Sequence, residues 1–143
     1  MESGVQVRSW SYKIHDFINI PIVGILASLC VAGLLNLVNS SVVTKIFAIY
    51  IVLDTTWIIT FPESIPRIAN FIVLHHILTF CILLHPLRYP EHSMETCRDG
   101  IVELNTFFLI LRRQLKRGSF FNLLCDSCYN LTLGIRFLWQ PYL

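Results

Sequence analysis

The chain has 143 residues, of which 55% are hydrophobic and only 14% are charged. A soluble domain typically carries about 25% charged residues, so this composition indicates a membrane protein. The net charge of +2 argues against the strongly basic surface that nucleic-acid-binding proteins present.

The cysteines and histidines do not form a metal or disulfide framework in the sequence. The number of cysteines, five, is odd, and most lie in apolar stretches, so we interpret them as small buried residues. Cys125 and Cys128 have the spacing of a redox or zinc motif, but no second ligand pair accompanies them. Of the five histidines, His15, His85 and His92 fall in expected tails or loops. The sequence therefore predicts no metal site and no cofactor.

The chain begins with a polar segment, residues 1–17, which we expect to be a tail. This segment lacks the short apolar core and the small-residue cleavage site of a signal peptide. Residues 17–44 carry no charge, and residues 20–38 match the roughly 20 residues that cross about 30 Å of hydrocarbon. Small residues such as Gly24 and Gly33 would allow close helix packing. The sequence predicts a first membrane span here, retained in the mature protein.

Four further apolar stretches alternate with polar loops. The second span ends at the prolines of residues 61–66, and the third is followed by the longest polar loop, residues 85–100. The fourth span is short and ends at two arginines. These four stretches are residues 42–61, 68–84, 100–111 and 120–139. The predicted fold class is an all-α bundle of about five membrane helices, with residues 18–143 forming one transmembrane domain.

The basic residues indicate an orientation for such a bundle. With five spans, seven of the eleven lysines and arginines lie on the side of the N-terminus. Short loops rich in lysine and arginine stay on the cytoplasmic side of a membrane, so we expect a cytosolic N-terminus.

Several polar groups lie near the middle of the apolar stretches. Asp54, His75, His76 and Glu103 are the clearest of them. A charge at such a position costs roughly 3 kcal/mol on insertion scales. Mutual pairing offsets this cost, so we expect Asp54 and Glu103 to meet the histidines, with an acid oxygen within about 3.5 Å of an imidazole nitrogen. Thr79 lies one helical turn after His75 and can hydrogen-bond beside it.

The histidine pair has two interpretations. In a dry pocket, His75 and His76 could act as a general base or as an acyl acceptor, because imidazole titrates near neutral pH. They could also be neutral histidines that bond to an acid and hold helices together. The sequence alone leaves both interpretations open.

The order of these features resembles a known membrane module. The matching residues are Asp54 in the second span, His75, His76 and Thr79 in the third, Glu103, Asn105, Thr106, Phe108 and Arg112 in the fourth, and Arg136 in the fifth. The sequence over residues 42–143 resembles the TLC domain, which ceramide synthases, translocon-associated membrane proteins and many small lipid-related proteins share. The resemblance implies a cavity lined by Asp54, His75, His76, Thr79, Glu103, Asn105 and Arg136. It also implies a further helix after the fifth span.

Two departures from the ceramide synthase pattern decide which branch the chain is similar to. The residues before His75 lack the acids of the synthase motif, and residues 99–103 lack its following histidine and aspartate run. The sequence therefore resembles the non-synthase branch. This resemblance implies a multi-pass protein of the endoplasmic reticulum or another internal membrane that acts in lipid binding, trafficking or homeostasis. Its partners would be membrane lipids, including acyl-CoA or a sphingolipid.

Two alternatives stay open at this point. One is an acyl-CoA-dependent N-acyltransferase in which His75 and His76 are catalytic. The other is a structural subunit that binds no ligand.

Overall fold

The computed structural model describes residues 10–65 and 68–139, with side chains described as far as residue 134. Throughout this part of the chain the structure is helical and contains no strand, which confirms the all-α fold class. The helices are α1 (Trp10–Leu34), α2 (Ser40–Thr60), η1 (Pro62–Ser64), α3 (Ala69–Arg88), η2 (Pro90–His92), α4 (Ser93–Asp99), α5 (Val102–Gln114) and α6 (Phe120–Trp139). The last five residues of α6 are described as backbone only.

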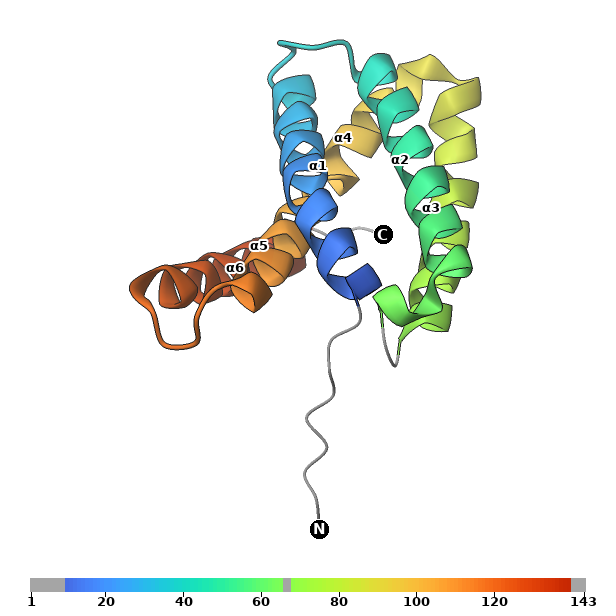
Figure 1. The fold of residues 1–143 in the computed structure, drawn as a ribbon. Helices are drawn as coiled ribbons and strands as arrows, with labels where there is room; N and C mark the ends of the chain where they lie inside the picture. Colours follow the sequence, from blue (N-terminus) through green and yellow to red (C-terminus); the bar gives the residue numbers. More distant parts are fainter. Residues whose placement is uncertain (1–9, 66–67, 140–143) are drawn as a thin grey trace.

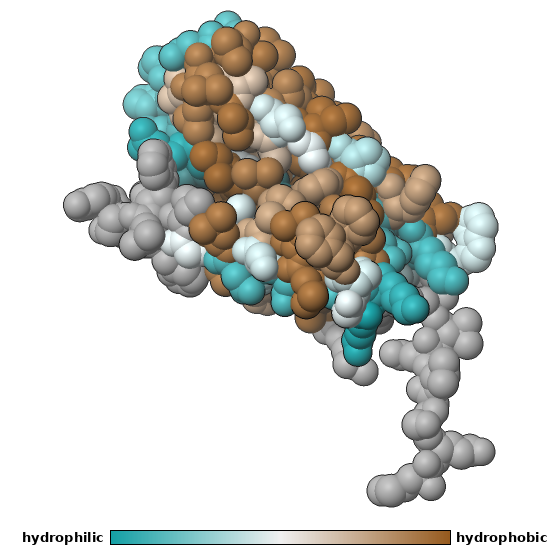
Figure 2. All heavy atoms as spheres, turned by 90° about the vertical axis from the view of Figure 1, so that its left-hand side faces the viewer, coloured by the Kyte–Doolittle hydropathy of each residue, from teal (hydrophilic) through white to brown (hydrophobic). Residues whose placement is uncertain are grey.

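Three of these helices support a membrane protein. Among the described residues, α1, α2 and α3 are long and apolar enough to cross a membrane, by length and composition. Helix α2 lies between α1 and α3 and packs against both (Figure 1), and Ile25, Ile59 and Leu78 are among the large apolar residues exposed on the three helices. The face of the molecule in Figure 2 is likewise largely apolar.

The fourth and fifth expected spans are helical but differ from the first three. Helix α5 has 13 residues, about 20 Å of helix, whereas the hydrocarbon core of a bilayer is about 30 Å thick. Helix α6 packs against α5 as a hairpin beside α1 (Figure 1). Asp126 of α6 forms an ion pair with Arg112 of α5, whose guanidinium also lies 5.4 Å from the centre of the Tyr129 ring.

The boundary predicted for the N-terminal tail is wrong. Helix α1 begins at Trp10, so residues 10–17 continue the first span instead of forming a tail. The physical reason is a buried stripe with helical spacing that crosses the expected boundary. The stripe comprises Tyr12, His15, Asp16, Asn19, Val23, Leu26, Ala27, Cys30 and Gly33.

The core lies between α1, α2 and the short helix α4, which falls within the predicted polar loop. Its buried residues are Leu26, Cys30, Val43, Phe47, Ala48, Ile51, Leu83 and Cys97. Gly33 of α1 lies against the Cys97 side chain, and Gly100 after α4 lies against the Cys30 side chain, with no room for a Cβ at either glycine. These close approaches fix α4 to α1 and so position the start of α5.

Candidate functional site

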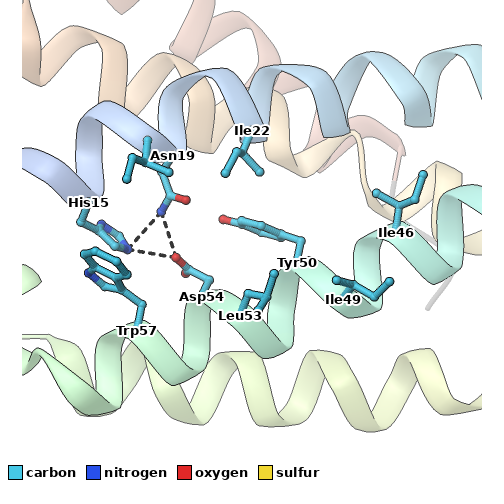
Figure 3. A pocket seen from close by; sticks show the side chains of 10 residues that line it. His15, Asn19, Ile22, Ile46, Ile49, Tyr50, Leu53, Asp54 and Trp57 are labelled. Atoms are coloured by element: carbon cyan, nitrogen blue, oxygen red, sulfur yellow. Dashed lines mark hydrogen bonds and ion pairs between the residues drawn. The ribbon is translucent and has the colours of Figure 1, made fainter.

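Asp54 is the centre of a buried polar cluster that joins α1 to α2. Its Oδ1 lies 2.9 Å from His15 Nε2, and Asn19 Nδ2 donates to the same oxygen at 3.0 Å (Figure 3). All three side chains are buried. Asn19 Nδ2 also lies 3.1 Å from His15 Nε2, which cannot both donate to the acid and accept from the amide. An ionised carboxylate is the stronger acceptor, so it favours the tautomer in which Nε2–H donates to Asp54.

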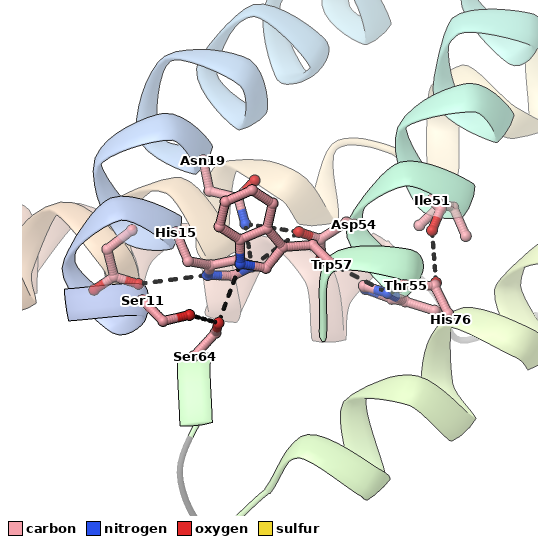
Figure 4. Close-up of polar contacts among 10 residues, drawn as sticks. Ser11, His15, Asn19, Ile51, Asp54, Thr55, Trp57, Ser64 and His76 are labelled. Carbon is pink, nitrogen blue, oxygen red and sulfur yellow. Dashed lines mark hydrogen bonds and ion pairs between the residues drawn. The ribbon is translucent and has the colours of Figure 1, made fainter. Parts of the chain in front are cut away.

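Helix α3 joins this cluster through His76, which is also buried. His76 Nδ1 lies 3.7 Å from Asp54 Oδ2 and 3.1 Å from Thr55 Oγ1 (Figure 4). The Thr55 hydroxyl donates its own hydrogen to the Ile51 carbonyl at 2.6 Å. Thr55 Oγ1 therefore accepts from His76, which places the imidazole proton on Nδ1. Asp54 thus lies at the point where α1, α2 and α3 meet.

A second layer of polar contacts closes one side of the cluster. Trp57 Nε1 donates to Ser64 Oγ at 3.1 Å, and Ser64 Oγ lies 2.5 Å from Ser11 Oγ (Figure 4). Because Ser64 accepts from Trp57, its hydroxyl hydrogen is available for Ser11. The Trp57 ring lies 6.4 Å from the His15 ring. These contacts tie η1 to the start of α1 and hold His15 against Asp54.

The polar cluster forms one end of a groove of about 340 Å³ between α1 and α2. The rest of the groove is apolar and runs away from the cluster along both helices (Figure 3). Its lining residues are His15, Ile18, Asn19, Ile22, Ile46, Ile49, Tyr50, Leu53, Asp54 and Trp57. We call this hollow the α1–α2 groove.

A second hollow, of about 350 Å³, contains the other predicted site residues. Its walls come from α2 to α5, and His75 is exposed at its surface. It is lined by Phe47, His75, Thr79, Ile82, Leu83, His85, Pro86, Glu95, Thr96, Asp99, Gly100, Val102 and Glu103. We call this hollow the acidic pocket.

The single polar centre expected from the sequence is therefore divided in two. Asp54 and His76 meet in the buried cluster, whereas His75 and Glu103 line the acidic pocket. The centres of the two imidazole rings, His75 and His76, lie 5.8 Å apart, and the rings face different surroundings. Adjacent residues on a helix point about 100° apart, which is why the pair separates. The Thr79 hydroxyl donates to the His75 carbonyl at 2.9 Å.

Two other predicted site residues lie outside both hollows or beyond the described side chains. Asn105 is buried at the α5–α6 contact, where its Oδ1 accepts from the Thr132 hydroxyl. Arg136 lies outside the residues whose side chains the structure describes.

Sequence reasoning missed two members of the cluster, His15 and Asn19. Assigning His15 to a tail and His85 to a loop was wrong, because these residues lie in α1 and α3, whereas His92 lies in the short turn η2 between α3 and α4. A signal was present, since His15 and Asn19 are four residues apart and continue the helical spacing of the buried residues further along α1. The physical reason for the miss is that the charged residues around them resemble a solvated segment.

The comparisons with known proteins do not assign the chain to a family. No protein-family model, no curated protein and no solved structure matches this chain. Within the described part of the chain, no three His, Cys, Asp or Glu side chains are arranged to hold a metal ion. The cluster and the two hollows are therefore the features that bear on function.

Proposed function

We propose that the protein is a TLC-type integral membrane protein that binds a membrane lipid in the α1–α2 groove. In this proposal it acts in lipid trafficking or homeostasis at the endoplasmic reticulum or another internal membrane. The observation that carries the proposal is the shape and lining of the groove. It is an elongated apolar hollow of about 340 Å³ that ends at a buried hydrogen-bonded cluster.

The lining of the groove matches the two parts of a lipid. Ile22, Ile46 and Ile49 line its apolar end, where an acyl chain would replace contact with bulk lipid (Figure 3). His15 and Asn19 line its polar end, where a headgroup would find hydrogen-bonding partners. A pocket with apolar walls and a few placed polar groups is the usual form of a small-molecule site.

The test fills the groove without touching the polar cluster. Ile22→Trp places an indole in the apolar end, and Ile25→Trp places the same indole on α1 outside the groove, at a residue that is 61% exposed. Wild type and both variants are purified in one detergent, and co-purifying lipids are quantified per mole of protein. We expect about a tenfold loss of the retained lipid for Ile22→Trp, equivalent to about 1.4 kcal/mol, and no loss for Ile25→Trp. Equal lipid content in all three proteins would refute the proposal.

The acyltransferase interpretation is the second candidate, and the exposed position of His75 favours it. An acyl donor could reach His75 in the acidic pocket, whereas Thr55 occupies His76. The measurement is N-acylation of a long-chain base by acyl-CoA, with His75→Ala as the variant. If the wild-type protein N-acylates the base and a well-folded His75→Ala protein does not, the acyltransferase interpretation would replace the lipid-binding proposal.

A further inference from the structure

The end of the α5–α6 hairpin carries exposed basic side chains without acidic partners. We call residues 113–124 the hairpin tip: the end of α5, the turn and the start of α6, a segment that contains no aspartate or glutamate. Its basic residues are Arg113, Lys116 and Arg117. All three are exposed, and within the described part of the chain none of their side chains forms a hydrogen bond or an ion pair. Arg112 differs from them, because Asp126 neutralises it.

The local structure places apolar side chains directly after the basic ones. Gly118 has a φ of +77°, a conformation that glycine adopts without strain. The Ser119 hydroxyl accepts from the Asn122 amide at 3.2 Å, so α6 begins as soon as the turn ends. Phe120 and Phe121 follow at once and are 74% and 64% exposed. Cations and large aromatic rings therefore share one exposed end of the hairpin.

The apolar side of the hairpin tip is only partly covered by the described part of the chain. Phe121 and Leu124 border an apolar hollow of about 340 Å³ between α5 and α6. Exposed aromatic and aliphatic residues beside exposed lysines and arginines are typical of segments that lie in a membrane interface. In such segments the rings enter the boundary between headgroups and acyl chains, while the cations stay among the headgroups.

The hairpin tip also lies at the level where α1 would enter a membrane. Gln114 Nε2 donates to Asp16 Oδ2 at 2.8 Å, which holds the end of α5 beside the first turns of α1 (Figure 1). Helix α1 has 25 residues, about 37 Å of helix, so its first turns would extend beyond a hydrocarbon core of about 30 Å. The Asp16 carboxylate is buried, whereas Lys13, one turn earlier, is exposed and adds positive charge at this level.

We propose that the hairpin tip docks on the anionic leaflet of a membrane. Arg113, Lys116 and Arg117 contact the headgroup oxygens, and Phe120 and Phe121 enter the boundary with the acyl chains. Charge complementarity identifies this occupant, since clustered cations at a membrane surface attract anionic lipids such as phosphatidylserine. A basic turn that only sets topology needs no preference among headgroups. The proposal requires α1 to span the membrane, and it does not depend on lipid binding in the α1–α2 groove.

The experiment compares two photoreactive phospholipids that share one labelled acyl chain and differ in headgroup, phosphatidylserine and phosphatidylcholine. The full chain is reconstituted in phosphatidylcholine nanodiscs with a trace of either probe, illuminated, and digested with a protease that does not cut at lysine or arginine. We expect the phosphatidylserine probe to label the hairpin tip about tenfold more, equivalent to about 1.4 kcal/mol. This preference should disappear in about 1 M salt, where the Debye length is about 3 Å. Equal labelling by the two probes at low salt would refute the proposal.

Two triple variants with the same change in net charge locate the effect. The first replaces the basic residues of the hairpin tip: Arg113→Gln, Lys116→Gln and Arg117→Gln. The control replaces three exposed basic residues at the other end of the helix bundle: Lys45→Gln, Arg88→Gln and Arg98→Gln. The tip variant should label equally with both probes, while the control keeps the tenfold preference. A preference that survives in the tip variant, or that is lost equally in the control, would overturn the proposal.

A second pair of variants tests the apolar half of the surface. Phe120→Gln should lower labelling of the hairpin tip by both probes several-fold, because the photoreactive group lies in the acyl chain. Phe71→Gln removes a similarly exposed ring from α3, 69% exposed, and should leave that labelling unchanged. Equal labelling of Phe120→Gln and wild type would show that the tip does not enter the leaflet. The Ile22→Trp measurement concerns lipid retained in detergent, where no leaflet is present, so either proposal can fail without the other.

Discussion

At the scale of single residues, the stability of the fold depends on the hydrogen bonds that the buried Asp54 carboxylate accepts. One carboxylate oxygen is bonded from α1 by His15 and Asn19, and the other faces His76 of α3. Burial of an ionised group is costly, and only a well-bonded arrangement of this kind offsets the cost.

Removing the α1 partner should therefore be strongly destabilising. His15→Ala leaves the Asp54 carboxylate buried with one fewer donor, and we expect a loss of about 3–5 kcal/mol in unfolding free energy. The control is His92→Ala, because the His92–Glu95 pair is exposed and its loss should cost about 1 kcal/mol or less. Thermal unfolding in one detergent measures both variants. A His15→Ala protein as stable as His92→Ala would show that the cluster contributes little to the fold.

Asp99 should make the unfolding free energy depend on pH, in a direction that follows from its raised pKa. The folded-state pKa is raised above the ordinary value of 3.8 by burial and by Glu95. The protonated Asp99 carboxyl makes its full contribution to the unfolding free energy at pH values below 3.8. This contribution is lost as the pH rises through the raised pKa of the folded state. Asp99→Asn should therefore unfold at a higher temperature than wild type at pH 7 and at the same temperature near pH 4. The shift in unfolding temperature is small because the Asp99 side chain is only partly removed from solvent. A variant less stable than wild type at pH 7 would contradict the assigned sign.

At the scale of helices, the packing of α4 depends on Gly100. A Cβ there would meet the Cys30 sulfur, the Phe47 ring and, at 2.9 Å, the Thr96 carbonyl of the same short helix. Gly100 has an ordinary helical φ of −66°, so the requirement for glycine is one of space and not of backbone conformation.

We expect Gly100→Ala to destabilise the protein by about 1–3 kcal/mol, the usual cost of overpacking. The matched control is Gly134→Ala in α6, where an added Cβ meets nothing within 4 Å. Alanine is the better helix former, so the control should be neutral or slightly stabilising. Thermal unfolding of both variants checks the prediction, which fails if the two substitutions have the same effect.

The helices themselves were largely predictable, because an apolar stretch of sufficient length has few alternatives to a helix. All five expected segments are helical, although the start of α1 was placed too late. Helix α4 was missed because its seven residues, SMETCRD, are mostly polar and lie between a proline-rich turn and a glycine. The site was less predictable, since the choice between His15 and His75 as the partner of Asp54 depends on helix rotation and crossing. Local spacing does not determine either of these.

At the scale of the whole molecule, α5 runs beside α1 in the opposite direction. Gly100 lies against Cys30, Gly24 faces the Phe107 ring, and Gln114 Nε2 donates to Asp16 Oδ2 at 2.8 Å. The α5–α6 turn, residues 115–119, is therefore near the level of the start of α1. This turn carries Lys116 and Arg117, which fits the expectation that the N-terminal side is cytosolic.

This arrangement predicts the positions of three tags. A tag before Trp10 and a tag in the 115–119 turn should lie on the same, cytosolic side, and a tag at η2 should lie on the opposite side. Protease protection in sealed microsomes measures each tag. A turn tag that is protected while the N-terminal tag is cleaved would contradict the antiparallel placement of α5.

The bond between His15 and Asp54 also has a consequence for how the chain enters a membrane during synthesis. The two residues are 39 positions apart, and the histidine emerges from the ribosome first. In the multi-pass protein proposed above, the donors of α1 would already be in place when α2 leaves the translocon, so the carboxylate would be bonded as it moves sideways into lipid. His76 and α3 arrive later and complete an arrangement that is already stable. Biogenesis of α2 would then depend on α1 as a chaperone in cis, and a ribosome-bound intermediate ending soon after Thr60 should already contain the paired helices.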